Sequence, residues 1–324
     1  VYRARKLQDP AVDIRPGRWK NVVTLDRDLS TEISFLLAAT VYAFFVPFSL
    51  STFVGGGSVG GIGVIDTVVL VGLYTLYIGI VVRGDVEEHT DQVGVPAYFQ
   101  SYSKRPRIAT VLLLFAYSGL LILTAVEPFA HGLEDLGRSF GIPSFFMIQW
   151  IAPLASESPE LIVVAYLVNK ARATAGFNAL ISSKLNQWTL LIGTLAVVYS
   201  IAAGQVGSLP FDEKQVAEIW ITAAQSFFAI AILSNFEISI REAVGLLVLF
   251  LSQVLIEFAF IRTLSEPLAE TYSIWLLYAY TAAYLALAIY LFARRRQEFR
   301  DLLGRTAVTA RQAIGRDAPV EGAD

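Results

Sequence analysis

Residues 152–161 read APLASESPEL and place two glutamates and two prolines inside an apolar run, 143–168, that is long enough to cross a membrane. A membrane span needs roughly 20 apolar residues, and an ionisable side chain at its centre costs about 2.5–3.5 kcal/mol on insertion scales. Pro159 removes a backbone donor and clashes with the carbonyl four residues before it, so we expect the helix to break here. Carbonyls freed in lipid are tolerated only where they line a cavity or bind an ion. The stretch therefore predicts an ion site at Glu157 and Glu160.

The two glutamates are three residues apart, so a helical turn between them points both side chains to the same side. Two carboxylates beside freed carbonyls form a hard oxygen site, which suits Na⁺, Ca²⁺ or a proton. The alternative reading is a pair of buried acids that neighbouring donors satisfy.

The composition is that of an integral membrane protein. Of 324 residues 55% are hydrophobic and 16% charged, and the mean hydropathy is +0.57. Soluble domains average about 25% charged residues. The chain has no cysteine, which excludes thiolate chemistry, and its net charge of -3 gives no general attraction to nucleic acid. His89 and His131 are expected in loops, so we expect no histidine metal site or catalytic triad in the membrane and no enzyme activity.

Apolar runs predict an all-α, polytopic helix bundle with about eight membrane spans and broken helices at the midplane. The fifth run is too long for one straight span, and Ser182, Ser183 and Lys184 in its middle predict a break or a strong tilt. The eight runs are 32–53, 62–82, 107–126, 143–168, 174–203, 217–233, 241–262 and 273–293.

Basic residues gather in the arm 1–31 and at the start of the tail 294–324. Because cationic loops are retained in the cytoplasm, we expect a multi-pass protein of the cell membrane with both termini cytoplasmic. These ends flank a transmembrane domain, 32–293, and the tail is expected to be a short amphipathic stretch followed by disorder.

A second polar cluster lies in the fifth span, at 181–189. If the span begins near Ala173, Lys184 is about eleven residues inside it, on the order of 16 Å deep at 1.5 Å per residue. A lysine at that depth is too far from the end to snorkel, so we expect it to pair with Glu157 or Glu160.

Other polar residues in the spans are weaker candidates. Gln225, Gln253 and Glu257 are either ion ligands or interhelical hydrogen-bond partners. Glu127, at the expected edge of the third span, is interpreted as a cap or vestibule residue.

Residues 155–161 and 182–187, joined by a loop with Lys170 and Arg172, resemble the α-repeat of the calcium/cation antiporter superfamily. That superfamily includes the sodium/calcium and proton/calcium exchangers. Further segments resemble the lead-in to the repeat, its apolar run ending in glycine, and a prokaryotic branch labelled sodium/calcium or sodium/proton exchanger; they are 136–143, 190–193, 209–212 and 221–228. The resemblance covers 107–293, the second half of the family, with its α-repeat at 136–203.

The resemblance implies a secondary active cation antiporter with alternating access around a midplane site. It implies ion binding by carboxylates, hydroxyls and amides, with Lys184 modulating the charge; the implied ligands are Glu160, Glu157, Ser156, Ser183, Asn186 and Gln187. Glu160 falls on the family's ion-binding glutamate. Three positions differ from the family's usual residues. Glu157 stands at a usual serine, Gln187 at a usual asparagine, and Lys184 where sodium/calcium exchangers often have asparagine.

Family members carry two α-repeats, and we find one. We expect the first repeat to lie upstream of Val1 in a longer chain or to come from a partner chain. Two carboxylates and one ammonium sum to about -1, whereas tight Ca²⁺ sites offer several uncompensated acids, so monovalent or proton-coupled exchange is also open.

Three functions therefore remain. The first is a sodium/calcium-type antiporter; the second is a Na⁺/H⁺ exchanger without calcium transport; the third is a non-transporting membrane subunit with a degenerate repeat. The expected partners are inorganic cations (Na⁺, Ca²⁺ or H⁺) and the lipid bilayer, with no nucleic acid and no resident cofactor. Glu160 and Glu157 are the expected Na⁺ or Ca²⁺ ligands.

Overall fold

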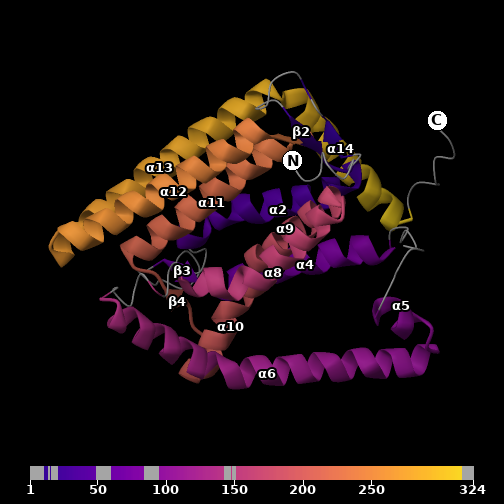
Figure 1. The fold of residues 1–324 in the computed structure, drawn as a ribbon, viewed down its shortest axis with the longest axis horizontal. Helices are drawn as coiled ribbons and strands as arrows, with labels where there is room; N and C mark the ends of the chain where they lie inside the picture. The colour runs from indigo at the N-terminus through magenta and orange to yellow at the C-terminus, as the bar shows by residue number, and fades with distance from the viewer. Residues whose placement is uncertain are drawn as a thin grey trace. The chain divides into compact units, whose positions relative to one another are not determined.

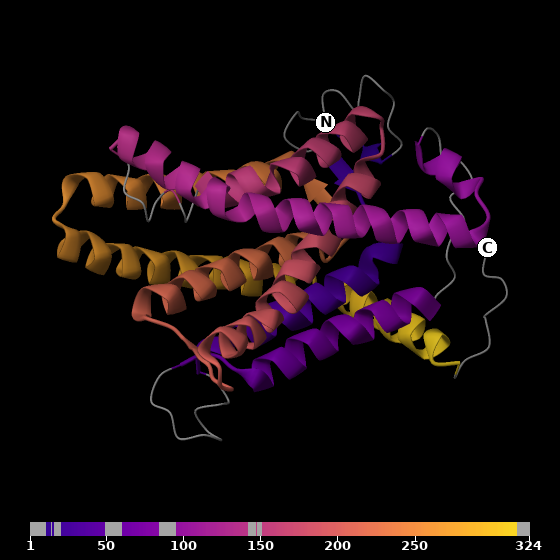
Figure 2. The ribbon, with the colours of Figure 1, turned by 90° about the horizontal axis from the view of Figure 1, so that it is seen from below.

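The computed structural model describes residues 11–13, 15, 21–48, 60–83, 95–141, 147 and 151–315, and almost all of them are helical (Figures 1 and 2). The chain divides into two compact units, which we describe separately. The larger combines Val1–Asp85 with Val164–Asp324, and the smaller is Val86–Val163.

The described residues of the larger unit contain eight helices. They are α2 (Ser30–Ala43), α4 (Val64–Arg83), α9 (Ala173–Asn186), α10 (Ile192–Ala203), α11 (Glu213–Leu233), α12 (Ile240–Thr263), α13 (Glu266–Arg294) and α14 (Arg296–Ala313). Single turns, η2 (Arg27–Leu29) and η3 (Val46–Phe48), flank α2. The smaller unit contains α5 (Val95–Gln100) and α6 (Lys104–Ser139), and α8 (Ala152–Asn169) begins in the smaller unit and ends in the larger.

Short strands tie the N-terminal arm to the helices of the larger unit. β1 (Val12–Asp13), β2 (Val22–Thr24) and β5 (Glu237–Ser239) form an antiparallel sheet in that order. A second pair joins β3 (Gly61–Ile62) to β4 (Leu209–Pro210). Because β5 connects α11 to α12, the described part of the expected arm 1–31 is packed on the membrane helices instead of forming a separate segment.

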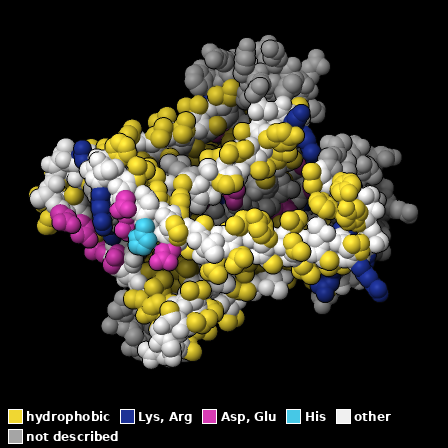
Figure 3. Space-filling model, turned by 60° about the horizontal axis from the view of Figure 1, so that its bottom comes forward, with side chains coloured by type: hydrophobic (Ala, Val, Ile, Leu, Met, Phe, Trp, Pro, Cys, Tyr) yellow, Lys and Arg dark blue, Asp and Glu magenta, His cyan; other side chains and the backbone are white. Residues whose placement is uncertain are grey.

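The core of the larger unit lies where α11 packs on α13 and α2, and where α10 packs on α4. Figure 1 shows α11, α12 and α13 side by side. Ile33, Leu185 and Tyr284 are among the largest fully buried side chains. Figure 3 shows many hydrophobic side chains on the face in view, with most of the charged side chains gathered at its left and right, a distribution that suits contact with lipid.

At Gly193 the helix α10 packs closely on α4. A Cβ at this position would lie 3.0 Å from Leu70 Cβ and 3.1 Å from Val71 Cγ2, whereas nothing lies within 4 Å of a Cβ at Gly72.

We expect Gly193→Val to destabilise the protein by about 1–3 kcal/mol, because the added side chain overpacks the contact between α10 and α4. Thermal unfolding followed by tryptophan fluorescence measures the effect. Gly72→Ala on the facing helix is the control and should not lower the melting temperature, and equal losses in the two variants would refute the packing argument.

Seven described helices are long and apolar enough to cross a membrane. The expected fourth span, 143–168, is not among them: its described part is α8, in which two glutamates, two serines and two prolines lower the hydropathy, and 142–146 and 148–150 lie outside the described residues.

The predicted break at Pro159 does not occur, because α8 runs without interruption from Ala152 to Asn169. The hydroxyl of Ser158 donates to the Ala155 carbonyl at 2.8 Å, and this is the carbonyl that loses its partner when Pro159 lacks an N–H. Pro153 lies in the first helical turn, where no backbone donor is needed. The Ser158 hydroxyl thus replaces the backbone donor that Pro159 lacks, and the helix continues.

The predicted break at 182–184 is displaced. The helix α9 continues through these residues, and its hydrogen-bond pattern widens into a π-helical turn, η5, at Gln187–Leu191 before α10 begins. Such turns are frequent at functional sites.

The third span also extends beyond its expected end. The helix α6 continues past Glu127 and Pro128 to Ser139, so Glu127 and His131 lie on a helix and not in a cap or loop. Ion-pair spacing at i,i+4 supports this extension: His131 Nε2 lies 4.0 Å from Glu127, and Arg138 lies 3.7 Å from Glu134. His89 lies outside the described residues.

The expected tail forms α14, which packs on the start of α2. The hydroxyls of Thr306 and Ser34 lie 2.8 Å apart, and Thr306 also donates to the Ser30 carbonyl at 2.8 Å. Residues 316–324, for which we expected disorder, lie outside the described residues.

Candidate cation-binding site

The first group of expected ligands lies on α8 within the smaller unit. Glu157 is exposed and Glu160 half-buried, one helical turn apart on the same side of the helix. The Ser156 hydroxyl donates to the Pro153 carbonyl at 3.1 Å, which leaves the lone pairs of its oxygen for a cation. α8 therefore presents two carboxylates and one hydroxyl oxygen within two turns.

The second group lies on α9 and η5 in the larger unit. Lys184 Nζ is 3.5 Å from Gln187 Oε1, a long hydrogen bond, and 5.9 Å from the centre of the Trp188 ring. The Trp188 indole in turn donates to Ser226 Oγ on α11 at 3.1 Å. Lys184 is thereby held beside α11. Ser183 is half-buried and Asn186 exposed.

The two groups of expected ligands belong to different units of the chain. The ion pair between Lys184 and Glu157 or Glu160 therefore stays a prediction, and so does the assembly of all six ligands into one site. Among the residues that the structure describes, no three histidine, aspartate or glutamate side chains form a metal-binding group.

Lys184 also lines a cavity of about 370 Å³ within the larger unit. Its polar lining comes from Lys184 and from Thr222, Gln225 and Ser226 on α11, with Tyr284 on α13, and the remainder is apolar. Among the lining residues that the structure describes, Lys184 is the only charged one. The sequence placed Gln225 among the candidates, and the structure brings it into the same cavity as Lys184.

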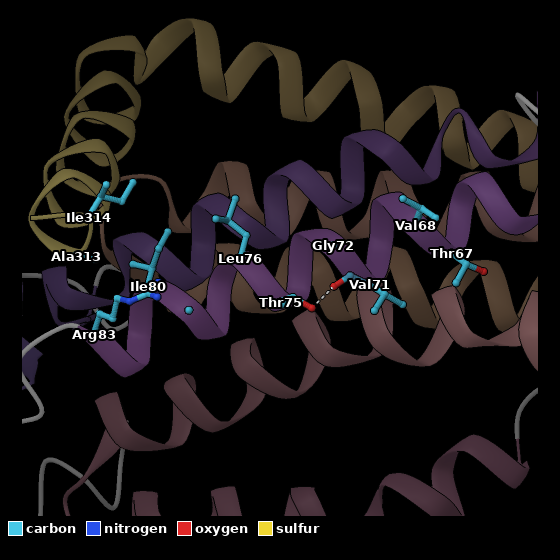
Figure 4. A pocket seen from close by; sticks show the side chains of 11 residues that line it. Thr67, Val68, Val71, Gly72, Thr75, Leu76, Ile80, Arg83, Ala313 and Ile314 are labelled. Carbon is cyan, nitrogen blue, oxygen red and sulfur yellow. Dashed lines mark hydrogen bonds between the residues drawn. The ribbon is translucent and has the colours of Figure 1, made fainter. Parts of the chain in front are cut away.

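A larger cavity, of about 790 Å³, runs along α4 from Thr67 to Arg83 and ends at Ala313 and Ile314 (Figure 4). The Thr75 hydroxyl, which lines it, donates to the Val71 carbonyl of its own helix at 2.8 Å. Among the described residues that line this cavity, Arg83 is the only charged one.

Two sets of acidic residues were missed. Glu32 on α2 accepts a hydrogen bond from Tyr77 at 3.3 Å, and its second carboxylate oxygen is buried without a hydrogen bond in the described chain. Ser182 also interacts with the Tyr77 hydroxyl. Glu32 was passed over because it stands at the first residue of an expected span, where a charge needs no partner.

Lys214 and Glu218 form the second missed set, together with the weak candidate Glu257. Lys214 Nζ lies 3.7 Å from Glu257 Oε1. The spacing of Lys214, Glu218 and Thr222 at i,i+4 along α11 is the signal that could have found them. The hydrogen bond between Gln225 and Gln253, at 2.9 Å, confirms the interhelical reading of these two residues.

Comparisons with known proteins agree with the fold. A family model described as sodium/calcium exchanger protein matches residues 110–259. A crystal structure of an H⁺/Ca²⁺ exchanger, CAX, is 39% identical with a TM-score of 0.77, over 98% of this chain and 70% of that one. No curated protein matches significantly. These likenesses in sequence and fold show that the chain belongs to the calcium/cation antiporter superfamily, the cation exchangers of which are multi-pass membrane proteins.

Proposed function

We propose that this chain exchanges Ca²⁺ for protons, with Glu160 and Glu157 of α8 as the groups that bind either ion. The observation that carries the proposal is the pair of acids on one side of α8, inside the segment that matches the exchanger family. The 39% identical H⁺/Ca²⁺ exchanger supports protons as the counter-ion. The family description leaves Na⁺ as the second candidate.

The carboxylates supply the exchange chemistry. Ca²⁺ takes 6–8 oxygen ligands, and two carboxylates with the Ser156 hydroxyl supply only part of that shell. We assign further oxygens to Ser183, Asn186 and Gln187. A protonated carboxyl no longer attracts Ca²⁺, so proton and cation compete for the same oxygens, and this competition couples their movements. The ammonium of Lys184 offsets negative charge when the site is empty.

We also propose that both termini lie on the cytoplasmic side. β2 of the N-terminal arm pairs with β5, and α14 packs on the start of α2, so the arm, the connection from α11 to α12 and the tail lie at one end of the larger unit. The basic run 294–296 at this end favours the cytoplasm.

The counter-ion is tested with the full chain in proteoliposomes loaded with ⁴⁵Ca²⁺. We expect a pH gradient to drive ⁴⁵Ca²⁺ movement and an equal Na⁺ gradient at constant pH to have no effect. Movement driven by Na⁺ alone would replace protons with Na⁺ as the coupling ion. Na⁺-driven proton movement without ⁴⁵Ca²⁺ flux would identify the Na⁺/H⁺ exchanger, and absence of every flux would favour the non-transporting subunit.

A further inference from the structure

α11 and α12 bury a row of polar side chains that the proposed site does not use. Glu257 on α12 is 0% exposed, and Gln253, one turn before it, is 2% exposed. α11 contributes Lys214, with a side chain 14% exposed, and the half-buried Glu218. Burial of so many polar groups in a membrane helix pair is costly and marks a functional candidate.

Glu257 is incompletely stabilised as a carboxylate. Its one ion pair, to Lys214, spans 3.7 Å, which is longer than a hydrogen bond. Neither carboxylate oxygen accepts a hydrogen bond from the described residues. A buried charge is stable only with good pairing and several hydrogen bonds, so this geometry favours uptake of a proton.

The charges of Lys214, Glu218 and Glu257 balance when one proton is bound. On α11, Glu218 interacts electrostatically with both Lys214 and Glu257. On α13, Glu257 lies opposite the stretch 272–280, because Ser252 contacts Tyr280 and Phe260 contacts Tyr272. The ionisable side chains of that stretch are tyrosines, which are neutral below about pH 10. Lys214, Glu218 and Glu257 sum to -1, and one added proton makes these three groups neutral. Asp212, the capping residue before α11, also interacts with Glu218 and adds negative charge.

The cluster is also connected to the cavity of Lys184. Gln225 Nε2 donates to Gln253 Oε1 at 2.9 Å, and Gln225 lines that cavity. Because Gln253 lies one turn before Glu257 on α12, polar side chains follow one another from Glu257 through the two glutamines to the cavity that Lys184 lines.

We propose that Glu257, with Lys214 and Glu218, is a proton-binding site separate from the cation ligands of α8, and that it exchanges protons with the cavity of Lys184. The proton adds to the Glu257 carboxylate, and the Lys214 ammonium then pairs with Glu218; release of the proton reverses both changes. In linking this site to exchange, the inference rests on the proposed function.

The proton is detected by infrared difference spectroscopy of the purified full chain during a pH titration. Above about pH 6, where ordinary carboxyls with a pKa near 4.3 are ionised, the wild type should keep a carboxylic acid C=O band. In the Glu257→Gln variant this band should lose the intensity of one carboxyl group, and in Glu160→Gln it should keep its full intensity. In Lys214→Met, loss of the ammonium should extend the band upward by about 1–3 pH units.

A merely structural ion pair predicts that neither Glu257→Gln nor Lys214→Met changes this band, and that result would overturn the inference. The shift in Lys214→Met requires no change at Glu257 itself, so the test holds even where Glu257→Gln fails to fold. In proteoliposomes, Glu257→Gln should lose ⁴⁵Ca²⁺ flux driven by a pH gradient but keep exchange of ⁴⁵Ca²⁺ for Ca²⁺. If the wild type shows the band but no flux, the proposed function fails and the proton site stands.

Discussion

Glu160→Gln should lower ⁴⁵Ca²⁺ flux at least about 100-fold, which corresponds to about 2.7 kcal/mol. The amide keeps the size of the side chain but removes the negative charge that binds Ca²⁺ and the group that accepts the competing proton. The variant should therefore lose flux driven by a pH gradient and also exchange of ⁴⁵Ca²⁺ for Ca²⁺. Initial rates in proteoliposomes at equal protein content measure both.

Glu127→Gln is the matched control, because Glu127 is an exposed acid on α6 outside the proposed site. We expect it to transport at the wild-type rate. Wild-type flux in Glu160→Gln would remove α8 from the mechanism, and equal losses in both variants would indicate a general effect of charge.

Arg295→Met should lower the free energy of unfolding by about 3 kcal/mol, the upper part of the range for hydrogen bonds to charged groups. The Arg295 guanidinium donates to the Ile232 carbonyl at the end of α11 at 2.6 Å and to the Glu242 carboxylate in the first turn of α12. It also donates to Asn235 Oδ1 at 3.2 Å. One side chain thus joins the ends of three long helices.

Methionine retains most of the apolar stem but none of these donors. Arg296→Met, an exposed neighbour, is the control and should unfold with the wild type. Thermal unfolding followed by tryptophan fluorescence compares the three proteins. If Arg295→Met and Arg296→Met melt at the same temperature, the contacts of Arg295 contribute little.

The fold class was predictable because hydropathy and span length report directly on the bilayer. The continuity of α8 through Pro159 was not predictable, because a proline in the sequence indicates a lost backbone hydrogen bond but not which group replaces the donor. Ser158 was visible in the sequence, yet only its position beside the Ala155 carbonyl shows that it compensates for Pro159. The same limit applies to 182–184, where polar side chains were read as a break and the helix widens at Gln187–Leu191 instead.

Contacts between distant segments were also beyond the sequence. The pairing of β2 with β5 joins residues more than two hundred positions apart. Glu257 was one of several weak candidates, and its position in the sequence does not indicate Lys214 as its partner. The ion pair depends on how α11 and α12 meet. The motif on α8, by contrast, is local, so Glu157 and Glu160 could be proposed as ligands from the sequence alone, and their role stays a prediction.

In the proposed mechanism, the α8 carboxylates bind the cation in competition with protons. Binding of ⁴⁵Ca²⁺ to the purified full chain, measured by equilibrium dialysis over a pH series, tests it directly. We predict saturable binding that weakens as the pH falls and is absent in the Glu157→Gln/Glu160→Gln double variant. Binding by the double variant with wild-type affinity and pH dependence would contradict the account.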